Sequence, residues 1–550
     1  MIMSTVAELI RAQADNQNPG LLFEDQSWTY AQFAQACAQR AAFLLDQPRN
    51  GPFHVGLLLD NEPEYLMWLG ACALAGATLV GVNPTRRGGD LARDIRHTEC
   101  RLLISNDNYW EELQSLDLGG AHCLNTDSQS YCEGLSNFEG ASLPDVNVSP
   151  KDMFCLIFTS GTTGAPKACI CSHGRITANV QLVIDDQGLT SDDVTYISMP
   201  LFHSNALMTG VLPSLGAGVP IALRRKFSAS GFLPDIRRFG ATYFCYVGKP
   251  LAYVLATPEQ ADDADNTLRR GMGNEAAHAD LKEFERRFAC RLLDAYGSTE
   301  GGVATVRNRD TPAGSLGLAM TSGMKVMNPA TMTECERARL DERGRLLNAD
   351  QAIGELVNTE GVPAFEGYWK NDEANAKRTR GGVIWMGDRG YRDADGYFYF
   401  VGRDGDGMRV DGENIGTSQV EQVLVRHPDV VIAAVYAVPD PVLGDRVMAA
   451  LQLREGAEFD AGTFAAFLRA QDDFGSKWMP SFFRIAAALP LTQTSKVIKH
   501  PLRQEKWRCA DPIWWQPHKS APWSLLTAAN IEQWEREFIE RGRGDVLAFT

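Results

Sequence analysis

Short runs of apolar residues alternate with amphipathic stretches along most of the chain. The runs HVGLLLD (54–60), RLLISND (101–107) and MFCLIFTS (153–160) are typical of buried strands. The stretches 29–45 and 88–97 instead place apolar residues at helical spacing. Strands that alternate with helices predict an α/β fold of layered, largely parallel sheets.

One long apolar stretch, 65–82, is barely long enough to cross a bilayer. Gly76 interrupts this stretch, and Asn83-Pro84 ends it. A buried helix to about Ala75, a turn and a short core strand at 78–82 explain the pattern better than a membrane span does.

The pattern changes near residue 402, where the Gly- and Asp-rich segment GRDGDG (402–407) follows an aromatic strand. The segment is too rich in turn residues for a packed element. Beyond it a new α+β pattern begins, with expected helices at 418–426 and 461–471 and expected strands at 430–438 and 447–453. We therefore expect a large N-terminal domain of layered α/β sheets (1–402), a hinge (403–406) and a small mobile α+β C-terminal domain (407–550).

The tail beyond Lys506 is rich in tryptophan, and its segment 527–541 is helical in pattern with Asn530 as the expected cap. We expect the indole rings to pack the tail onto the body of the protein and not to bind a ligand. The tryptophans are Trp507, Trp514, Trp515, Trp523 and Trp534.

Composition narrows the classes of function. The 550 residues are 44% hydrophobic and carry a net charge of −16, which disfavours binding to a nucleic acid backbone. The 12 cysteines form neither a CxxC pair nor a zinc-ligand pattern, so free thiols in a reducing cytoplasm are expected. The N-terminus lacks the basic and apolar regions of a signal peptide.

The strongest chemical signal is the loop Thr159-Ser-Gly-Thr-Thr-Gly-Ala-Pro-Lys167, which follows an apolar strand. Its hydroxyls, flexible glycines and lysine suit the binding of a polyphosphate. A Walker A loop is excluded, because Pro166 takes the place of its second glycine and Ala168 follows the lysine. A Ser–His–Asp hydrolase is rejected as well, because the chain has no GxSxG elbow.

This loop resembles the phosphate-loop signature of the adenylate-forming superfamily, which includes acyl-CoA synthetases, firefly luciferase and peptide-synthetase adenylation domains. Further signatures resembling those of the superfamily follow in the expected order: Pro200-Leu-Phe-His-Ser204, Gly273-Asn-Glu275, Tyr296-Gly-Ser-Thr-Glu300, Gly354-Glu-Leu356, Gly367-Tyr-Trp369, Gly387-Asp388, Gly402-Arg403, Gly412-Glu-Asn-Ile415 and Pro490-Leu-Thr-Gln-Thr-Ser-Lys496. The pieces NPTR (83–86) and RVDGEN (409–414) are most similar to the fatty-acid-transport-protein and very-long-chain branch, close to bacterial synthetases for sterol or diterpenoid acids.

The resemblance implies a role for individual residues. Lys496, Thr299, Glu300 and His203 would form the catalytic set, with Glu300 also holding Mg²⁺ and His203 at the wall of the acid pocket. Tyr296 would stack on adenine, Asp388 would accept from the ribose hydroxyls, and Arg403 would reach ribose or phosphate. The remaining nucleotide- or CoA-binding positions would be Thr159, Ser160, Gly161, Thr162, Thr163, Gly164, Lys167, Gly273, Asn274, Glu275, Gly297 and Gly412.

The function that the resemblance implies is an acid–thiol ligase. Such an enzyme would use ATP, Mg²⁺ and coenzyme A to convert a bulky hydrophobic carboxylic acid into its CoA thioester through acyl-AMP. Two alternatives stay open: a ligase that only thioesterifies a supplied acyl-AMP, and an acyl-AMP ligase that loads a carrier protein. The resemblance also leaves open a homodimer, peripheral membrane contact and a partner ligase that makes the acyl-AMP.

Two features concern the acid and its activation. The pocket candidates Met199, Phe202, Met208, Tyr246 and Met272 suit a large apolar acid. Met386 precedes Gly387-Asp388 where the superfamily usually has Ser or Thr. Methionine cannot donate a hydrogen bond, so two outcomes stay open. The change weakens the adenylation step, or it has no effect on the rate of that step.

Overall fold

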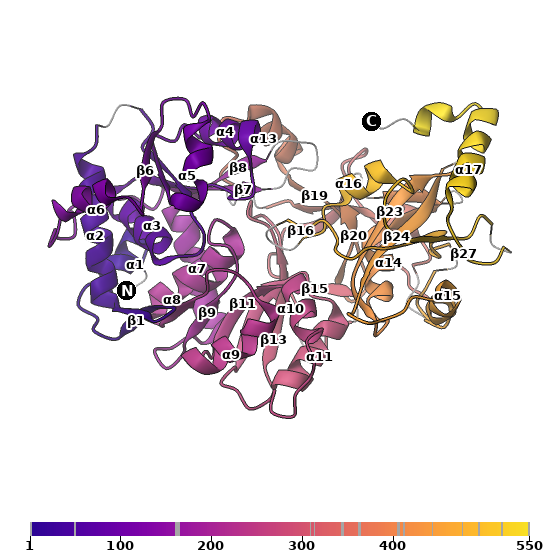
Figure 1. The fold of residues 1–550 in the computed structure, drawn as a ribbon, viewed down its shortest axis with the longest axis horizontal. Helices are drawn as coiled ribbons and strands as arrows, with labels where there is room; N and C mark the ends of the chain where they lie inside the picture. Colours follow the sequence, from indigo (N-terminus) through magenta and orange to yellow (C-terminus); the bar gives the residue numbers. More distant parts are fainter. Residues whose placement is uncertain are drawn as a thin grey trace.

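The computed structural model describes residues 3–48, 51–159, 166–307, 310–312, 314–342, 346–360, 365–403, 407–410, 413–442, 444–475, 477–492, 496–518 and 521–547. The indigo and magenta N-terminal two-thirds form layered sheets and helices, while the orange and yellow C-terminal part forms a separate unit at the other end of the molecule (Figure 1). The α/β fold with a separate C-terminal domain is confirmed.

The first sheet is formed early in the chain, and its described strands lie in the order β6-β5-β3-β4-β7-β8. All neighbours in it are parallel except β7 and β8, which pair as an antiparallel hairpin. The three apolar runs of the sequence are strands of this sheet, as predicted. The strands are β3 (His54–Leu58), β4 (Thr78–Gly81), β5 (Leu102–Ser105), β6 (His122–Asn125), β7 (Met153–Thr159) and β8 (Lys167–Ser172).

The second sheet is larger and mixed. Its parallel half is β10-β9-β11-β12-β13, with β1 also parallel at one side. From β13 onward every neighbour is antiparallel, so the expectation of largely parallel sheets fails for this half, where hairpins replace crossover helices. Its strands are β1 (Pro19–Phe23), β2 (Gln26–Thr29), β9 (Thr195–Ile197), β10 (Ile221–Leu223), β11 (Tyr243–Val247), β12 (Arg270–Asn274), β13 (Arg291–Gly297), β14 (Ala304–Val306), β15 (Ser315–Ala319), β16 (Met324–Asn328), β17 (Thr333–Glu334), β18 (Gly354–Asn358), β19 (Ile384–Arg392) and β20 (Phe398–Arg403).

The helices agree with the amphipathic pattern. The stretch expected at 29–45 is helix α2 (Tyr30–Asp46), which begins at a capping box between Thr29 and Gln32. The apolar stretch 65–82 is the buried helix α3 (Pro63–Ala75) followed by β4, as expected. None of the helices formed by the described residues has the length and apolarity needed to cross a membrane.

The remaining helices of this part connect and cover the sheets. They are α1 (Val6–Arg11), α4 (Gly88–His97), α5 (Asp107–Gln114), α6 (Gln129–Ser136), α7 (His173–Gln187), the π-helix η1 (Ala206–Val211), α8 (Leu212–Ala217), α9 (Ala229–Phe239), α10 (Gly248–Leu255), α11 (His278–Phe288), α12 (Ala349–Ala352), α13 (Asp372–Arg378) and the 3-10 helix η3 (Arg380–Gly382).

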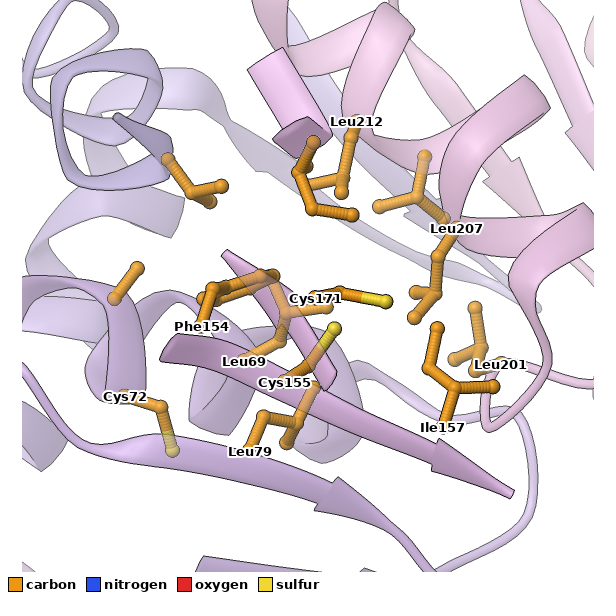
Figure 2. Close-up of a cluster of buried hydrophobic side chains, with 14 of the residues drawn as sticks. Leu69, Cys72, Leu79, Phe154, Cys155, Ile157, Cys171, Leu201, Leu207 and Leu212 are labelled. Atoms are coloured by element: carbon orange, nitrogen blue, oxygen red, sulfur yellow. The ribbon is translucent and has the colours of Figure 1, made fainter. Parts of the chain in front are cut away.

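The main core joins the first sheet to the helices that follow β9. Phe154, Cys155 and Ile157 of β7 pack in one cluster with Leu207 of η1 and Leu212 of α8. Figure 2 shows these side chains converging from the strand and the helices, with the sulfurs of Cys155 and Cys171 turned toward each other. All 12 cysteines are unpaired, as expected.

The C-terminal unit has its own sheet, in the order β23-β24-β25-β26-β27. The tail contributes β26 and β27, and Trp507, Trp515 and Trp534 are buried against Phe482, so the tail packs onto this unit as expected. Its elements are β21 (Gly407–Val410), β22 (Glu413–Gly416), α14 (Thr417–Leu424), β23 (Val430–Pro439), β24 (Asp445–Leu453), α15 (Ala461–Arg469), β25 (Phe482–Ile485), α16 (Lys499–Glu505), β26 (Ile513–Trp515), β27 (Ser524–Leu525), α17 (Ala528–Glu540) and η4 (Gly544–Leu547).

The cap of α17 differs from the expectation. Thr527 is the N-cap, and Asn530 is the third helical residue, whose side chain accepts from the Thr527 amide at 3.0 Å. Asn530 thus completes a capping box, because its side chain reaches back to the N-cap backbone.

Candidate active site

The carboxyl ends of four neighbouring parallel strands carry much of the expected site. Strands β9, β11, β12 and β13 run in the same direction. His203 follows β9, Asn274 ends β12, and Tyr296 and Gly297 end β13. Ligands of open parallel sheets bind at this edge, so the fold brings together residues that are far apart in the sequence.

Close backbone packing shapes this edge. A side chain at Gly273 would place its Cβ 2.2 Å from the carbonyl oxygen of Tyr246 on β11. Only glycine fits there. Two residues on, Glu275 has a φ of +63°, so the chain turns sharply as it leaves β12.

Asp388 and Tyr296 form one side of the site. The Tyr296 hydroxyl donates a hydrogen bond to Oδ2 of Asp388 at 2.6 Å, which fixes the buried carboxylate. Asp388 on β19 lies opposite Arg403 on β20. The side chain of Arg403 lies outside the described residues, so its expected reach to the nucleotide stays a prediction.

Glu300 and Thr299 are both buried just beyond β13. The Tyr368 hydroxyl donates to Oε1 of Glu300 at 2.8 Å, and Nη2 of Arg378 lies 3.5 Å from the same oxygen. Burial raises the pKa of Glu300, but Arg378 and the Tyr368 hydroxyl outweigh it and hold the pKa below its usual value. The Thr299 hydroxyl is within hydrogen-bonding distance, 2.9 Å, of the Ser204 hydroxyl.

The two ends of the phosphate-loop motif are fixed by the β7–β8 hairpin, in which Thr159 lies opposite Lys167. The ammonium of Lys167 lies 5.2 Å from the centre of the Tyr368 ring. Burial of the ammonium and, to a smaller extent, repulsion from Arg378 lower the pKa of Lys167. The expected phosphate contacts of Ser160, Gly161, Thr162, Thr163 and Gly164, and the role of Gly412, fall outside the described residues.

Lys496 comes to this site from the C-terminal unit. Its Nζ lies 2.6 Å from Oε1 of Glu275. Burial and the nearby positive charge of Lys496 lower the pKa of His203 to about 4, although Glu275 opposes them. The imidazole is therefore neutral at physiological pH, which agrees with an expected wall position and does not suit a general base.

Comparisons with known proteins identify the family. A family model described as AMP-binding enzyme matches residues 10–369, and one described as AMP-binding enzyme C-terminal domain matches residues 419–496. The chain belongs to the AMP-binding enzyme family. The expected superfamily is thereby confirmed.

Two curated relatives and one solved structure illustrate the similarity. The chain is 46% identical to the steroid-22-oyl-CoA synthetase of Rhodococcus jostii over 98% of both chains. It is also 46% identical to the medium/long-chain-fatty-acid–CoA ligase FadD17 of Mycobacterium tuberculosis, over 93% of this chain and 98% of the relative. The fold matches that of the anthranilate CoA ligase AuaEII in complex with anthranoyl-AMP, with a TM-score of 0.80 at 22% identity over 92% of this chain and 97% of that one.

One pocket candidate, Tyr246, packs on the face of its strand that points away from the main core in this AMP-binding enzyme. Tyr246 packs among Phe244 and Phe284 on the face of β11 covered by α10 and α11, and its hydroxyl donates to the Leu293 carbonyl at 3.0 Å. Cys245 and Val247 face η1 and the main core instead. Every residue of β11 is buried, so the sequence carried no alternation from which the face could be predicted.

The other pocket candidates are distributed around the segment after β9. Met199 and Phe202 are buried in the main core, with Met208 packed against it. Met272 packs instead beside Leu189 and Tyr243. Residues 206–211 form a π-helix, a rare element that is often found at functional sites.

Sequence reasoning missed two residues that surround Glu300. Tyr368 belongs to the noted Gly367-Tyr-Trp369 motif, but its hydrogen bond to Glu300 was not foreseen. Arg378 had no motif to mark it. Asn375 ties the two together, because its side chain accepts from the Tyr368 amide at 2.7 Å and donates to the Tyr368 carbonyl at 3.1 Å.

Proposed function

We propose that the protein is an acyl-CoA synthetase that activates a bulky hydrophobic carboxylic acid as acyl-AMP and then forms the CoA thioester. The observation that carries the proposal is the position of Lys496. This lysine comes from the C-terminal unit and reaches Glu275 beside His203, at the strand edge where Asp388 and Glu300 are also found. That position suits a cation required only while the C-terminal unit is closed over a nucleotide.

The first half-reaction places charge where the chain has cations. A carboxylate oxygen of the acid attacks the α-phosphorus of ATP, and the bond from that phosphorus to the bridging oxygen breaks, so pyrophosphate leaves with the electron pair. Lys496 would meet the charge on the α-phosphate oxygens, and Lys167 the charge on pyrophosphate. Asp388, held by the Tyr296 hydroxyl, would accept from the ribose hydroxyls.

The binding of Mg²⁺ with ATP is part of the proposal. Glu300 is ionised, and a carboxylate oxygen is a ligand that Mg²⁺ prefers. No group of three or more metal-ligating side chains occurs in the described residues, which agrees with a cation held by one carboxylate and by substrate phosphates. Bound Mg²⁺ would neutralise phosphate charge at Glu300.

The second half-reaction is an acyl transfer to sulfur. The CoA thiolate attacks the acyl carbon of acyl-AMP, and AMP leaves with the electrons of the broken C–O bond. A neutral His203 agrees with this step, because a mixed anhydride needs little base catalysis.

We further propose the domain boundaries expected from the sequence. Residues 1–402 and 407–550 would alternate about a hinge at 403–406, and the Gly412 loop would replace Lys496 at the site.

The substrate class is inferred from relatives and from the apolar candidates near His203. The relatives are named for a steroid-22-oyl group and for medium- and long-chain fatty acids. We therefore propose a sterol side-chain acid or another long or polycyclic acid, in a cytoplasmic enzyme. A homodimer, contact with a membrane surface and a partner adenylating ligase stay predictions.

A panel of acids tests the function. Purified enzyme is supplied with ATP, Mg²⁺ and CoA and with one acid at a time: a sterol side-chain acid, a diterpenoid acid, a long-chain fatty acid, benzoate or acetate. Large acids should give a thioester, whereas acetate should be poor because each Å² of apolar surface left unburied forfeits about 25 cal/mol. Equal efficiency with acetate contradicts the substrate class, and transfer only to a carrier-protein phosphopantetheine supports the carrier-loading alternative.

A further inference from the structure

Arg378 is a largely buried cation between two parts of the candidate site. One part holds Glu300, the expected metal ligand, and the other holds Asp388, the expected ribose ligand. Only 12% of the Arg378 side chain is exposed. It ends helix α13, and its Nη2 lies 3.5 Å from Oε1 of Glu300. On the other side, a Cβ at Gly387 would lie 4.0 Å from Nη1 of Arg378. The guanidinium therefore spans the space from the expected metal ligand to the residue before Asp388.

Among the residues that the structure describes, few partners satisfy the charge of Arg378. A guanidinium has five N–H donors, yet among the described residues its one ion pair is the 3.5 Å contact with Glu300. The Nε atom is buried and has no hydrogen-bond partner there. Buried charges are normally paired and hydrogen-bonded, so this arrangement is unusual unless a ligand completes it.

Arg378 also adds positive charge where the phosphate loop rejoins β8. It repels the ammonium of Lys167, the last residue of the loop motif. Tyr368 contacts both sides of this cluster: its hydroxyl donates to Glu300, and its ring lies under the Lys167 ammonium. The hydrogen bonds between Asn375 and the Tyr368 backbone hold α13 against this cluster. Two cations and one carboxylate are thus fixed together beside the loop expected to bind polyphosphate.

We propose that Arg378 binds the β- and γ-phosphates of ATP and the pyrophosphate that leaves, and that it occupies Glu300 only while no nucleotide is bound. When ATP brings a divalent cation to Glu300, the guanidinium exchanges the carboxylate for phosphate oxygens, which it contacts in a bidentate manner. Arg378 then stabilises pyrophosphate as its bond to the α-phosphorus breaks. This inference rests on the proposed adenylation activity.

The test separates the two half-reactions. Arg378→Met is compared with wild type in ATP–pyrophosphate exchange at several pyrophosphate concentrations, and in thioester formation from supplied acyl-AMP and CoA. We expect at least a tenfold weaker apparent affinity for pyrophosphate and for ATP, with thioester formation from acyl-AMP within about twofold of wild type. Arg378→Lys should recover part of the affinity, because it restores the charge without the bidentate geometry.

Lys377→Met is the matched control, because Lys377 is an exposed cation on the same helix and has no described contact with Glu300. It should behave as wild type. An unchanged affinity of Arg378→Met for pyrophosphate, with only the Mg²⁺ requirement altered, would show that Arg378 merely neutralises Glu300 and would overturn the proposal. An equal loss in both half-reactions would overturn it as well. Wild type that shows no acid-dependent pyrophosphate exchange would instead contradict the proposed adenylation.

Discussion

The ammonium of Lys496 lies 2.6 Å from Oε1 of Glu275, so a residue of the C-terminal unit contacts the edge of the N-terminal sheet. Other contacts support the same arrangement: the Arg454 guanidinium donates to the Leu255 carbonyl at 3.3 Å, and Ala252 of α10 packs in the core of the C-terminal unit. The structure thus captures an arrangement in which Lys496 faces the sheet edge where the nucleotide is expected to bind.

Loss of the Lys496 charge should affect one half-reaction. Lys496→Ala should reduce acyl-AMP formation by about 10²–10³-fold, because removing a preorganised charged donor typically costs about 3–4 kcal/mol. Thioester formation from supplied acyl-AMP should stay nearly intact. The two rates are measured separately, with Lys499→Ala as control, since Lys499 pairs with Glu421 at 2.8 Å and not with Glu275. Equal loss in both steps would refute the assignment of Lys496 to one domain arrangement.

Loss of the Glu275 charge should have only a small effect on the adenylation rate. The Glu275 side chain is 47% exposed and that of Lys496 30%, so solvent screens their ion pair, which is worth about 1 kcal/mol at most. Glu275→Gln should lower the adenylation rate by no more than about fivefold and make it less sensitive to salt. Exchange assays at low and high salt check this, with Glu283→Gln as the exposed control. A loss above a hundredfold would assign Glu275 a chemical role.

The lowered pKa of His203 predicts a stability effect with a definite sign. The folded pKa is about 4, below the ordinary value of 6.5, because the ring is buried and Lys496 is near. The neutral ring thus contributes stability that is fully present above pH 6.5 and is lost as the pH falls from 6.5 to about 4, by up to about 3 kcal/mol.

The same pKa should respond to Lys496. Lys496→Met removes a positive charge beside the ring, so the pKa of His203 should rise and the loss of stability between pH 6.5 and 4 should become smaller. Chemical denaturation at several pH values in wild type, Lys496→Met and Lys499→Met measures this. An identical pH dependence in all three proteins would show that Lys496 does not act on His203 in solution.

Regular elements could be predicted from sequence because their signals are local. The capping box at Thr29 and Gln32 and the apolar runs at 54–60 and 153–160 each specify an element without distant partners. The contact of Arg378 with Glu300 could not be predicted in this way. It depends on Asn375 folding α13 against Tyr368, an arrangement that no local pattern encodes. The face of Tyr246 was equally unpredictable, because β11 is buried on both sides.

The packing of Met386 favours the full two-step reaction over the alternative in which only thioester formation takes place. Its side chain is 5% exposed and packs with Ile384 in the main core, and its sulfur lies 3.6 Å from where a Cβ on Gly302 would be. Asp388 is held by the Tyr296 hydroxyl, and the Gly387 amide donates to Oε1 of Glu355 at 2.7 Å. The segment is therefore positioned without a hydroxyl at 386.

Wild type should accordingly form thioester from free acid plus ATP and from preformed acyl-AMP, each with CoA. Met386→Ser should change the ratio of the two rates by less than about threefold, while lowering the free energy of unfolding by about 2–3 kcal/mol because a buried side chain is lost from the core. Both rates and urea denaturation are measured on the two proteins. The opposite result is also defined: wild type forms thioester only from acyl-AMP, and Met386→Ser or Met386→Thr gains ATP-dependent activity. That result would establish that Met386 suppresses adenylation, because in-line attack at phosphorus tolerates misplacement less than acyl transfer does.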